Sequence, residues 1–544
     1  MRFGIHVIAV ALFLSACSGQ QEPTTPASVT PVTVAPQKMN ILFIIDEDLT
    51  HRAVSVYGNK AVQTPNLERL AKESLVFDNA YVQSPMCGPS RAAFLSGYRP
   101  LSTGILTNQH LMSEKTPASA KSFAALLKQG GATTASIGKL YHGREEPESM
   151  QDFDRLEFTP VPTGYKGVHT TQGKFACRQK RFEYSSDPVL EQELFRRRDE
   201  YNEQMKTWSR ANPRYWFEVG IPYIGFDMQI IGDSGMPVEC DEDYRKAQLA
   251  AQMIREYGES GEQFFLSIGF SKPHVPLKVP KPYIDLYDPN KIVMSAATPD
   301  KDKNVPAAAK RFGVKPDIFT TWFDEEFPQL RETPERQRQA VAAYYAAASF
   351  VDAQVGVLMD ALVEAGLYDN TIVVFTTDHG FHLGEHGLWS KYSVYDEGIR
   401  VPFMVRMPGS AANGRRTSAI VELMDLVPTF MDIWGLPTPD YFEGTSFKPV
   451  LDNPDRQWKQ AAFTTFNLEG VSARADVTGH TIRTQQYRYT QWGDQSEFGK
   501  ELYDFAKDPL EQNNVASDPA YADIAKDLST RLKQGWQAAL PPDL

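Results

Sequence analysis

The chain has 544 residues, of which 42% are hydrophobic and 23% are charged. This composition excludes a disordered protein, a fibrous repeat and a small disulfide-dense fold, and the length suits a large domain with a smaller one. The 56 Lys and Arg residues against 68 Asp and Glu residues leave a net charge of −12. We therefore do not expect a general nucleic-acid-binding protein.

Residues 1–16 have the pattern of a secretory signal peptide. Arg2 precedes an apolar run over residues 5–14, which is too short to span a bilayer. The sequence Leu-Ser-Ala-Cys then ends at Cys17 and resembles the lipobox of bacterial lipoproteins. The resemblance implies lipidation of Cys17, and Ser18, which is not Asp, favours the outer membrane. The alternative is an ordinary secretory signal with an incidental cysteine.

Residues 17–38 are predicted to form an extended tether, because four prolines lie among Ser, Thr and Gln. No later segment is expected to be long and apolar enough to span a membrane, so the lipid is the only expected membrane attachment. The chain has four cysteines. Two of them, Cys177 and Cys240, could pair in an oxidising envelope, although their spacing does not show that they lie close together.

Three continuous apolar segments predict buried parallel strands, because a strand covered on both faces needs apolar residues throughout. They span residues 39–45, 263–270 and 370–377. Polar residues follow each segment: Asp46-Glu47-Asp48, Lys272-Pro273-His274 and Asp378-His379-Gly380. In open α/β sheets, ligands bind beyond the carboxyl ends of the strands, so these polar residues are candidate site residues.

Helical patterns lie between the predicted strands. One helix is expected to begin at Pro65 with Thr64 as its cap, and an Ala-rich helix is expected over residues 337–365, ending at Gly366. The expected fold is therefore a large α/β domain over residues 39–454.

The pattern changes towards the C-terminus. Shorter strand-like pieces such as residues 487–490, and a terminal helix over about 520–537, predict a smaller α+β subdomain over residues 455–544. An insertion over residues 178–215 is rich in Arg and Lys and is expected to form a solvated basic surface.

The segment beginning at Cys87 reads Cys-Gly-Pro-Ser-Arg and is followed by Leu95-Ser96-Gly97. It resembles the signature of type I sulfatases, members of the alkaline phosphatase superfamily, whose cysteine is converted to formylglycine (3-oxoalanine) by a separate maturation enzyme. The resemblance implies a sulfuric ester hydrolase with the sulfatase fold, an α/β fold with a large, mixed and mostly parallel sheet sandwiched by helices. The alternative is a structural cysteine in a Pro-containing turn.

A formylglycine has a chemical advantage over a serine. Its hydrate is a geminal diol, so that one hydroxyl attacks sulfur while the other stays in reserve. The carbonyl then re-forms and expels sulfate, whereas a serine would be left as a stable sulfate ester. A helix starting near Pro89 is expected to aim free backbone N–H groups at the anion, and Arg91 is expected to hold the diol.

The polar ends of the first and third strands resemble the family's metal-binding segments. The resemblance, which is greatest to the iduronate-2-sulfatase branch, implies a cation held by Glu47, Asp48, Asp378, His379 and the converted Cys87. Because three acids are consecutive, Asp46 remains an alternative to Glu47. Carboxylates suit a hard cation, Ca²⁺ or alternatively Mg²⁺, and no Cys or His pair has zinc spacing. His382 and His386 are expected to be structural or rim residues.

Three further segments resemble the family's cationic motifs. They contain Gly-Lys-x-x-His at residues 138–142, Lys-Pro-His at residues 272–274, and a lysine after the second metal segment. The resemblance implies that Lys139 and Lys391 bind sulfate oxygens and that His142 supports the diol. His274 is then the acid that protonates the leaving alcohol.

The expected function is removal of sulfate from a sulfated carbohydrate, such as a polysaccharide-derived oligosaccharide with a 2-O-sulfated uronic acid. The expected location is the cell envelope, on the outer membrane. A phosphate or phosphonate monoester hydrolase of the same superfamily is the first alternative. A catalytically silent glycan-binding lipoprotein is the second, although every expected site position is filled.

Overall fold

The computed structural model describes residues 39–117, 119–142, 149–157, 231–298, 300–310, 333–469 and 477–542. The predicted signal peptide, the tether with Cys17, the basic insertion and Cys177 lie outside the described residues.

The main sheet has eight strands in the order β12-β2-β11-β8-β1-β6-β3-β4. Strand β11 is antiparallel to both of its neighbours, and the other described pairs are parallel. The predicted mixed, mostly parallel sheet is therefore confirmed. The strands are β1 (Asn40–Asp46), β2 (Leu75–Tyr81), β3 (Thr133–Gly138), β4 (Arg155–Glu157), β6 (Phe264–Gly269), β8 (Thr371–Thr377), β11 (Phe403–Arg406) and β12 (Arg416–Glu422).

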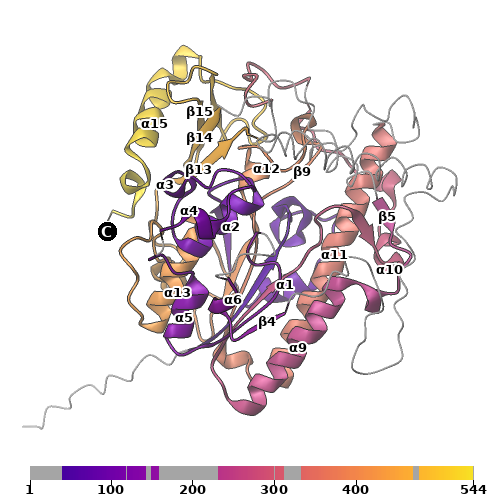
Figure 1. The fold of residues 1–544 in the computed structure, drawn as a ribbon. Helices are drawn as coiled ribbons and strands as arrows, with labels where there is room; N and C mark the ends of the chain where they lie inside the picture. The colour runs from indigo at the N-terminus through magenta and orange to yellow at the C-terminus, as the bar shows by residue number, and fades with distance from the viewer. Residues whose placement is uncertain are drawn as a thin grey trace, which may run out of the picture. The chain divides into compact units, whose positions relative to one another are not determined.

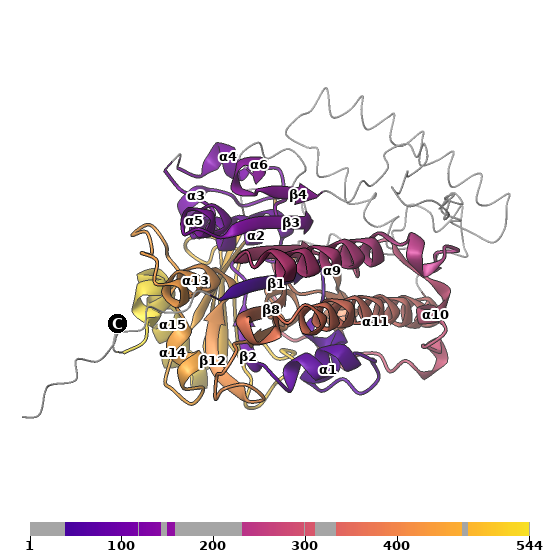
Figure 2. The ribbon, with the colours of Figure 1, turned by 90° about the horizontal axis from the view of Figure 1, so that it is seen from below.

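Helices cover both faces of this sheet, as Figure 2 shows. On one face, Leu42 and Ile44 of β1 pack in a cluster with α1 (Pro65–Ala71), α9 (Glu242–Ser260) and α11 (Pro334–Glu364). On the other face, Ile41 and Phe43 pack with α2 (Cys87–Ser96), α5 (Phe123–Gln129) and α13 (Leu426–Trp434). Alternate residues of one central strand thus enter two separate apolar clusters, as the two-residue period of a strand requires.

The starts of two helices were predicted, and one of the two is capped by a side chain close to it in the sequence. Helix α11 begins three residues before the predicted position, because Thr333 accepts a hydrogen bond from the Arg336 N–H and caps it. The prediction that Thr64 caps α1 through its side chain is wrong: its hydroxyl contacts Ser55 instead. The first-turn N–H groups of α1 are satisfied from a distant element, because Asp352 of α11 accepts hydrogen bonds from the N–H groups of residues 66 and 67.

Among the described residues, α11 is long and apolar enough to cross a membrane by length and composition. The expectation that no later segment passes this test is therefore wrong. The helix is apolar because it packs in the core against the central sheet: 78% of its most apolar 18-residue window is buried inside the fold.

A second, antiparallel sheet follows in the order β13-β14-β15-β16, and α15 (Ala522–Gln534) packs against it (Figure 1). Its strands are β13 (Ala462–Asn467), β14 (Thr478–Arg483), β15 (Tyr487–Trp492) and β16 (Lys500–Asp504). This is the predicted C-terminal α+β subdomain. The sheet adjoins the main domain through a hydrogen bond from the Thr465 N–H to the Gln83 carbonyl, at 2.9 Å.

Short elements complete the described chain. They are α3 (Pro100–Thr103), α4 (Met112–Lys115), α6 (Ser149–Asp152), α10 (Lys281–Ile284), α12 (Asp396–Ile399), α14 (Lys448–Asp452), β5 (Ile231–Asp233), β7 (Leu277–Val279), β9 (His382–Leu383) and β10 (Trp389–Ser390).

Candidate active site

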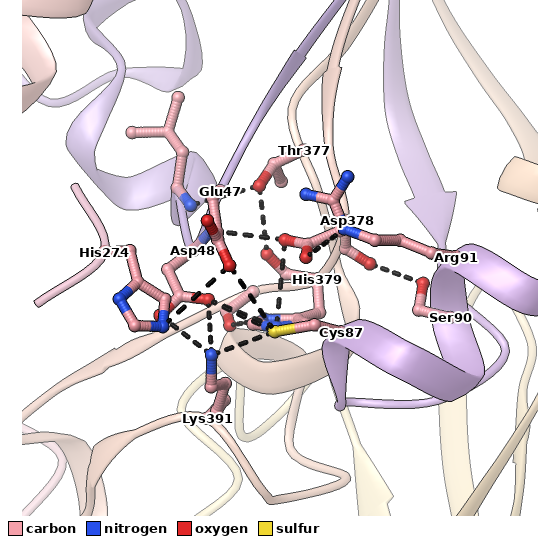
Figure 3. Close-up of polar contacts among 12 residues, drawn as sticks. Glu47, Asp48, Cys87, Ser90, Arg91, His274, Thr377, Asp378, His379 and Lys391 are labelled. Carbon is pink, nitrogen blue, oxygen red and sulfur yellow. Dashed lines mark hydrogen bonds and ion pairs between the residues drawn. The ribbon is translucent and has the colours of Figure 1, made fainter. Parts of the chain in front are cut away.

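The predicted polar segments meet at one edge of the main sheet. Strands β6, β1 and β8 are neighbours and parallel, so the residues after their carboxyl ends lie side by side. The Asp48 N–H donates to Asp378 Oδ1 at 3.2 Å, and the Leu49 N–H donates to Thr377 Oγ1 at 3.1 Å. These bonds hold the two acidic segments together (Figure 3).

Cys87 is the first residue of α2, and its side chain points into this cluster (Figure 3). Its Sγ atom lies 3.0 Å from Lys391 Nζ and 3.1 Å from His379 Nε2. It lies 3.9 Å from a Glu47 oxygen and 4.0 Å from an Asp48 oxygen. Burial would raise the pKa of the thiol, but Lys391 and Lys139 outweigh burial and hold the pKa below its ordinary value.

The start of α2 is less open to an anion than expected. The Gly88 N–H donates to Asn108 Oδ1 at 2.7 Å, and Pro89 has no N–H to offer. The predicted row of free amides is therefore wrong at Gly88. A side chain at position 88 would also bring a Cβ within 2.9 Å of Asn108 Oδ1 and 3.4 Å of His142 Cδ2, so close packing requires glycine here.

A cation would fit the buried group of donors formed by Asp48, Cys87, Asp378 and His379, whose ligand atoms all lie within 4.8 Å of one another. His379 Nδ1 donates to the Gly380 carbonyl at 2.9 Å, which leaves Nε2 facing the carboxylates, as a metal-ligating imidazole requires. With the carboxylates close by, the pKa of His379 rises to about 9 despite burial.

Glu47 belongs to a cluster of close ligand atoms, and Asp46 does not. Glu47, Asp48 and His274 form a second group of close ligand atoms, and Asp46 belongs to neither group. Asp46 is the last residue of β1, on the same side as Leu42 and Ile44, which face α9 and α11. Burial, and then the nearby Asp243 of α9, raises the pKa of Asp46 well above its ordinary value.

Three predicted cations of the site, the two sulfate-binding lysines and the arginine expected to hold the diol, contact the carboxylates. Lys391 Nζ lies 2.8 Å from Asp48 Oδ1, and Lys139 Nζ contacts Glu47 Oε1. Arg91 is fully buried and donates through Nε to Asp378 Oδ2 at 2.9 Å. Its Nη1 donates to the carbonyl of Lys139 at 2.9 Å, so Arg91 also orders the segment that carries that lysine.

The two predicted histidines differ in exposure. His142 lies beside Gly88, and burial, followed by the charge of Lys139, lowers its pKa to about 3, so its imidazole is neutral. The His274 side chain is 34% exposed, and its Nε2 lies 3.9 Å from both Glu47 Oε1 and Asp48 Oδ2. Its Nδ1 donates to the Val275 carbonyl at 2.8 Å, which directs Nε2 towards the site.

Asp243 was not predicted, although it fixes the segment that carries His274. This buried residue of α9 accepts hydrogen bonds from the N–H groups of Ser271 and Lys272, each at 2.9 Å, and from Lys246 Nζ at 2.8 Å. No local motif marks it, because its partners come from another element. The sequence does contain one indication of this role: Asp243 is an acidic residue on the apolar face of an amphipathic helix, and a buried charge of this kind requires a partner.

Other polar residues have structural roles. His382 contacts Ser393, and His386 contacts Asp302 at 2.9 Å and stacks on Tyr395. Both histidines are buried. Of the two predicted alternatives, structural or rim residues, this agrees with the structural one. Cys240 is disulfide-bonded, while its predicted partner, Cys177, lies outside the described residues, so that pairing stays a prediction.

Comparison with known proteins identifies the class. Residues 39–436 match the family model described as Sulfatase, and residues 384–538 match the one described as N-sulphoglucosamine sulphohydrolase, C-terminal. The chain belongs to the sulfatase family of the alkaline phosphatase superfamily and is a sulfuric ester hydrolase. The family prediction is therefore confirmed.

Individual relatives cover nearly the whole chain. Iduronate 2-sulfatase of Mus musculus is 28% identical, with 91% of this chain and 94% of the relative covered. N-acetylglucosamine-6-O-sulfatase of Bacteroides thetaiotaomicron is 29% identical, with 96% and 89% covered. The structure of phosphonate monoester hydrolase from Agrobacterium radiobacter has the same fold, with a TM-score of 0.68, 22% identity, and 91% of this chain and 95% of that chain covered.

Proposed function

We propose that the protein removes sulfate from a sulfated carbohydrate, using a formylglycine made from Cys87 by a separate maturation enzyme. The observation that carries this proposal is the position of Cys87: at the start of a helix, its Sγ faces Lys391, His379 and two carboxylates within 4.0 Å. Sγ stands in for the reacting oxygen of the converted side chain.

The proposed reaction has two steps. One hydroxyl of the aldehyde hydrate at residue 87 attacks sulfur and releases its proton to water, and the sulfur–oxygen bond to the sugar breaks. The leaving sugar oxygen takes a proton from His274, whose Nε2 faces the cluster from its partly exposed edge. The second hydroxyl then gives its proton to His274, which restores the acid, while the carbonyl re-forms and sulfate leaves. Water hydrates the aldehyde again for the next turnover.

A hard cation, Ca²⁺ or Mg²⁺, would be held by Asp48, Asp378, His379 and residue 87, with Glu47 at the edge of the group. When bound, it would polarise the sulfate oxygens and stabilise the charge that develops on them. Lys139, which contacts Glu47, and Lys391, which contacts Asp48, would bind the remaining sulfate oxygens. Because these cations are fixed before the substrate arrives, they stabilise the transition state without reorganising.

Two supporting residues complete the arrangement. Arg91 holds Asp378 and, through the Lys139 carbonyl, the segment that carries a sulfate-binding lysine. His142 is neutral and lies beside residue 88, and we propose that it accepts a hydrogen bond from the hydrate at the adjacent residue 87. The cationic pocket explains how a chain of net charge −12 holds an anionic substrate.

Two relatives support a sugar substrate: an iduronate 2-sulfatase and an N-acetylglucosamine-6-O-sulfatase. We favour a 2-O-sulfated uronic acid or a similar sugar in a polysaccharide-derived oligosaccharide. The test is a panel of defined sulfated oligosaccharides, each with a single sulfate position, with desulfation followed by NMR. Loss of one sulfate position supports the proposal, whereas no turnover of any sugar sulfate contradicts it.

A phosphonate or phosphate monoester hydrolase is the second candidate, because a phosphonate monoester hydrolase has the same fold. Turnover of matched sulfate and phosphate esters of one alcohol distinguishes a sulfatase from a phosphate or phosphonate hydrolase. We expect kcat/KM to be higher for the sulfate ester. A silent glycan-binding lipoprotein is disfavoured, because Cys87, Arg91, Lys139 and Lys391 are all present and converge.

We also propose that the mature protein is a lipoprotein of the outer membrane, anchored through Cys17. The support is the short apolar run and the Leu-Ser-Ala-Cys sequence. Radiolabelled palmitate should be incorporated into the full-length protein in cells and should not be incorporated into Cys17→Ser. Equal labelling of both proteins, or labelling of neither, would overturn the proposal.

A further inference from the structure

A cavity of about 360 Å³ lies on the C-terminal sheet, between that sheet, α3 and the segment after α15. Figure 1 shows α3 beside β13 and β14. The floor of the cavity is a row of three side chains on adjacent strands, because Thr465 pairs with His480 and His480 pairs with Gln491. Residues paired in this way point to the same face of a sheet.

This face of the sheet is turned away from the catalytic cluster. Phe466 and Trp492, on the opposite face, pack with Met86 and Tyr392, which are the neighbours of Cys87 and Lys391. Since successive residues of a strand point to opposite faces, Thr465 lies on the other side from Phe466. The cavity is therefore separated from the reaction centre by the thickness of the sheet.

The walls of the cavity are aromatic. Phe463 and Trp536 both lie near the Arg99 guanidinium, with ring centroids 5.8 Å and 5.6 Å from its central carbon. Both line the cavity. Flat apolar walls above a floor of hydroxyl, imidazole and amide groups match the mixed character of small-molecule sites, and the volume lies in their range.

The charges around the cavity are balanced. Both terminal nitrogens of Arg99 donate to Glu422, each at 2.7 Å, so the guanidinium has a carboxylate partner already. Lys533 and Asp494 line the cavity with opposite charges. Burial lowers the pKa of His480, so the imidazole is neutral near pH 7. This contrasts with the catalytic cluster, where three cations converge.

We propose that this cavity is a second, non-catalytic carbohydrate site that binds an uncharged sugar ring of the glycan chain. This proposal rests on the proposed function in one respect: the bound sugar ring is assumed to belong to the same glycan as the sulfated sugar. The apolar face of the ring lies against Trp536 and Phe463, and its hydroxyls bind the polar floor. Holding the chain at a second point raises the effective concentration of sulfated ends near Cys87.

The test measures binding apart from turnover. A heparan tetrasaccharide, either sulfated or fully desulfated and then N-acetylated so that its glucosamine rings are uncharged, is titrated by calorimetry into Cys87→Ala protein, alone and with Trp536→Ala, Trp536→Phe or Thr465→Trp. Trp536→Ala removes a wall, Thr465→Trp fills the cavity from its floor, and Trp536→Phe keeps an aromatic face. Circular dichroism and thermal melting select the variants that are folded.

We expect the desulfated tetrasaccharide to bind, with a Kd at least about tenfold higher in Trp536→Ala and Thr465→Trp, which corresponds to about 1.4 kcal/mol. The Kd of Trp536→Phe should stay within about threefold of the parent value, because the phenyl ring still stacks on the sugar. In protein whose Cys87 has been converted to formylglycine, Trp536→Ala should raise KM for the polymer and leave kcat/KM for a monosaccharide sulfate unchanged.

Unchanged binding in both folded cavity variants would overturn the proposal, as would an equal loss of activity on polymer and monosaccharide. Failure of the proposed function has a different signature. A protein that binds the desulfated glycan through this cavity but hydrolyses no sugar sulfate would refute the proposed reaction and leave the second site in place.

Discussion

Cys87 Sγ and Lys391 Nζ lie 3.0 Å apart, although 304 positions separate the two residues in the chain. The same lysine nitrogen lies 2.8 Å from Asp48 Oδ1. Desolvation opposes a buried ammonium group, but Asp48 and Cys87 hold its pKa well above the ordinary value. A fixed positive charge is therefore present where the sulfate oxygens of the substrate are expected.

Replacing Lys391 tests this charge. Lys391→Met should lower kcat/KM for a sulfate ester by about 10²–10³, the usual cost of removing one charge-stabilising donor. Steady-state kinetics measures the loss. The matched control is Lys448→Met, because Lys448 pairs with Asp452 in an exposed i,i+4 contact and should leave kcat/KM unchanged. A loss below about threefold in Lys391→Met would contradict the role assigned to Lys391.

Removing the cation should abolish turnover and lower stability together. Chelation leaves Asp48 and Asp378 buried without a full countercharge, and an ion present at 100 times its Kd contributes about 2.7 kcal/mol to the free energy of unfolding. Activity and melting temperature are measured after chelation and again after adding Ca²⁺. We expect both to recover with Ca²⁺, and Asp378→Asn to weaken the response. Full activity in the chelated protein would argue against a metal site.

The proposed acid can be tested through the leaving group. His274→Ala should reduce kcat/KM for a sugar sulfate by about 10²–10⁴, the usual contribution of general acid catalysis. It should have a smaller effect on an activated aryl sulfate, whose leaving group needs no proton. The ratio of the two losses is the measurement. Equal losses on both substrates would exclude His274 as the acid.

Asp243 should act through His274. Its carboxylate holds the N–H groups of Ser271 and Lys272, so Asp243→Ala should release the segment before His274. We expect a loss of kcat/KM that is larger for the sugar sulfate than for the aryl sulfate, as in His274→Ala. Asp243→Asn keeps one acceptor oxygen and should recover part of this difference. A uniform loss on both substrates would indicate a structural role alone.

Much of the site follows from three apolar strands that end in polar residues. The parallel order of β6, β1 and β8 places the residues after each strand at one edge, and this was predictable from continuous apolar runs. The choice between Asp46 and Glu47 could not be predicted, because β1 ends at Asp46 and the alternation of a strand does not extend to the residues that follow it.

Contacts between distant elements could not be predicted. Asn108 accepts the Gly88 N–H, and Asp352 rather than Thr64 satisfies the start of α1. Each of these partners lies on another element, so no local signal marks it. The antiparallel position of β11 between β8 and β2 has the same cause, because a short buried strand carries no sign of its direction.

The chemical state of residue 87 is the most direct test. Protein is produced with and without a formylglycine-generating enzyme, and the tryptic peptide that contains residue 87 is analysed by mass spectrometry with and without a hydrazide probe for aldehydes. We predict that the aldehyde fraction rises in proportion to kcat on a sulfate ester, and that folded Cys87→Ala has neither aldehyde nor turnover. Full turnover by protein whose residue 87 is an intact thiol would contradict the account.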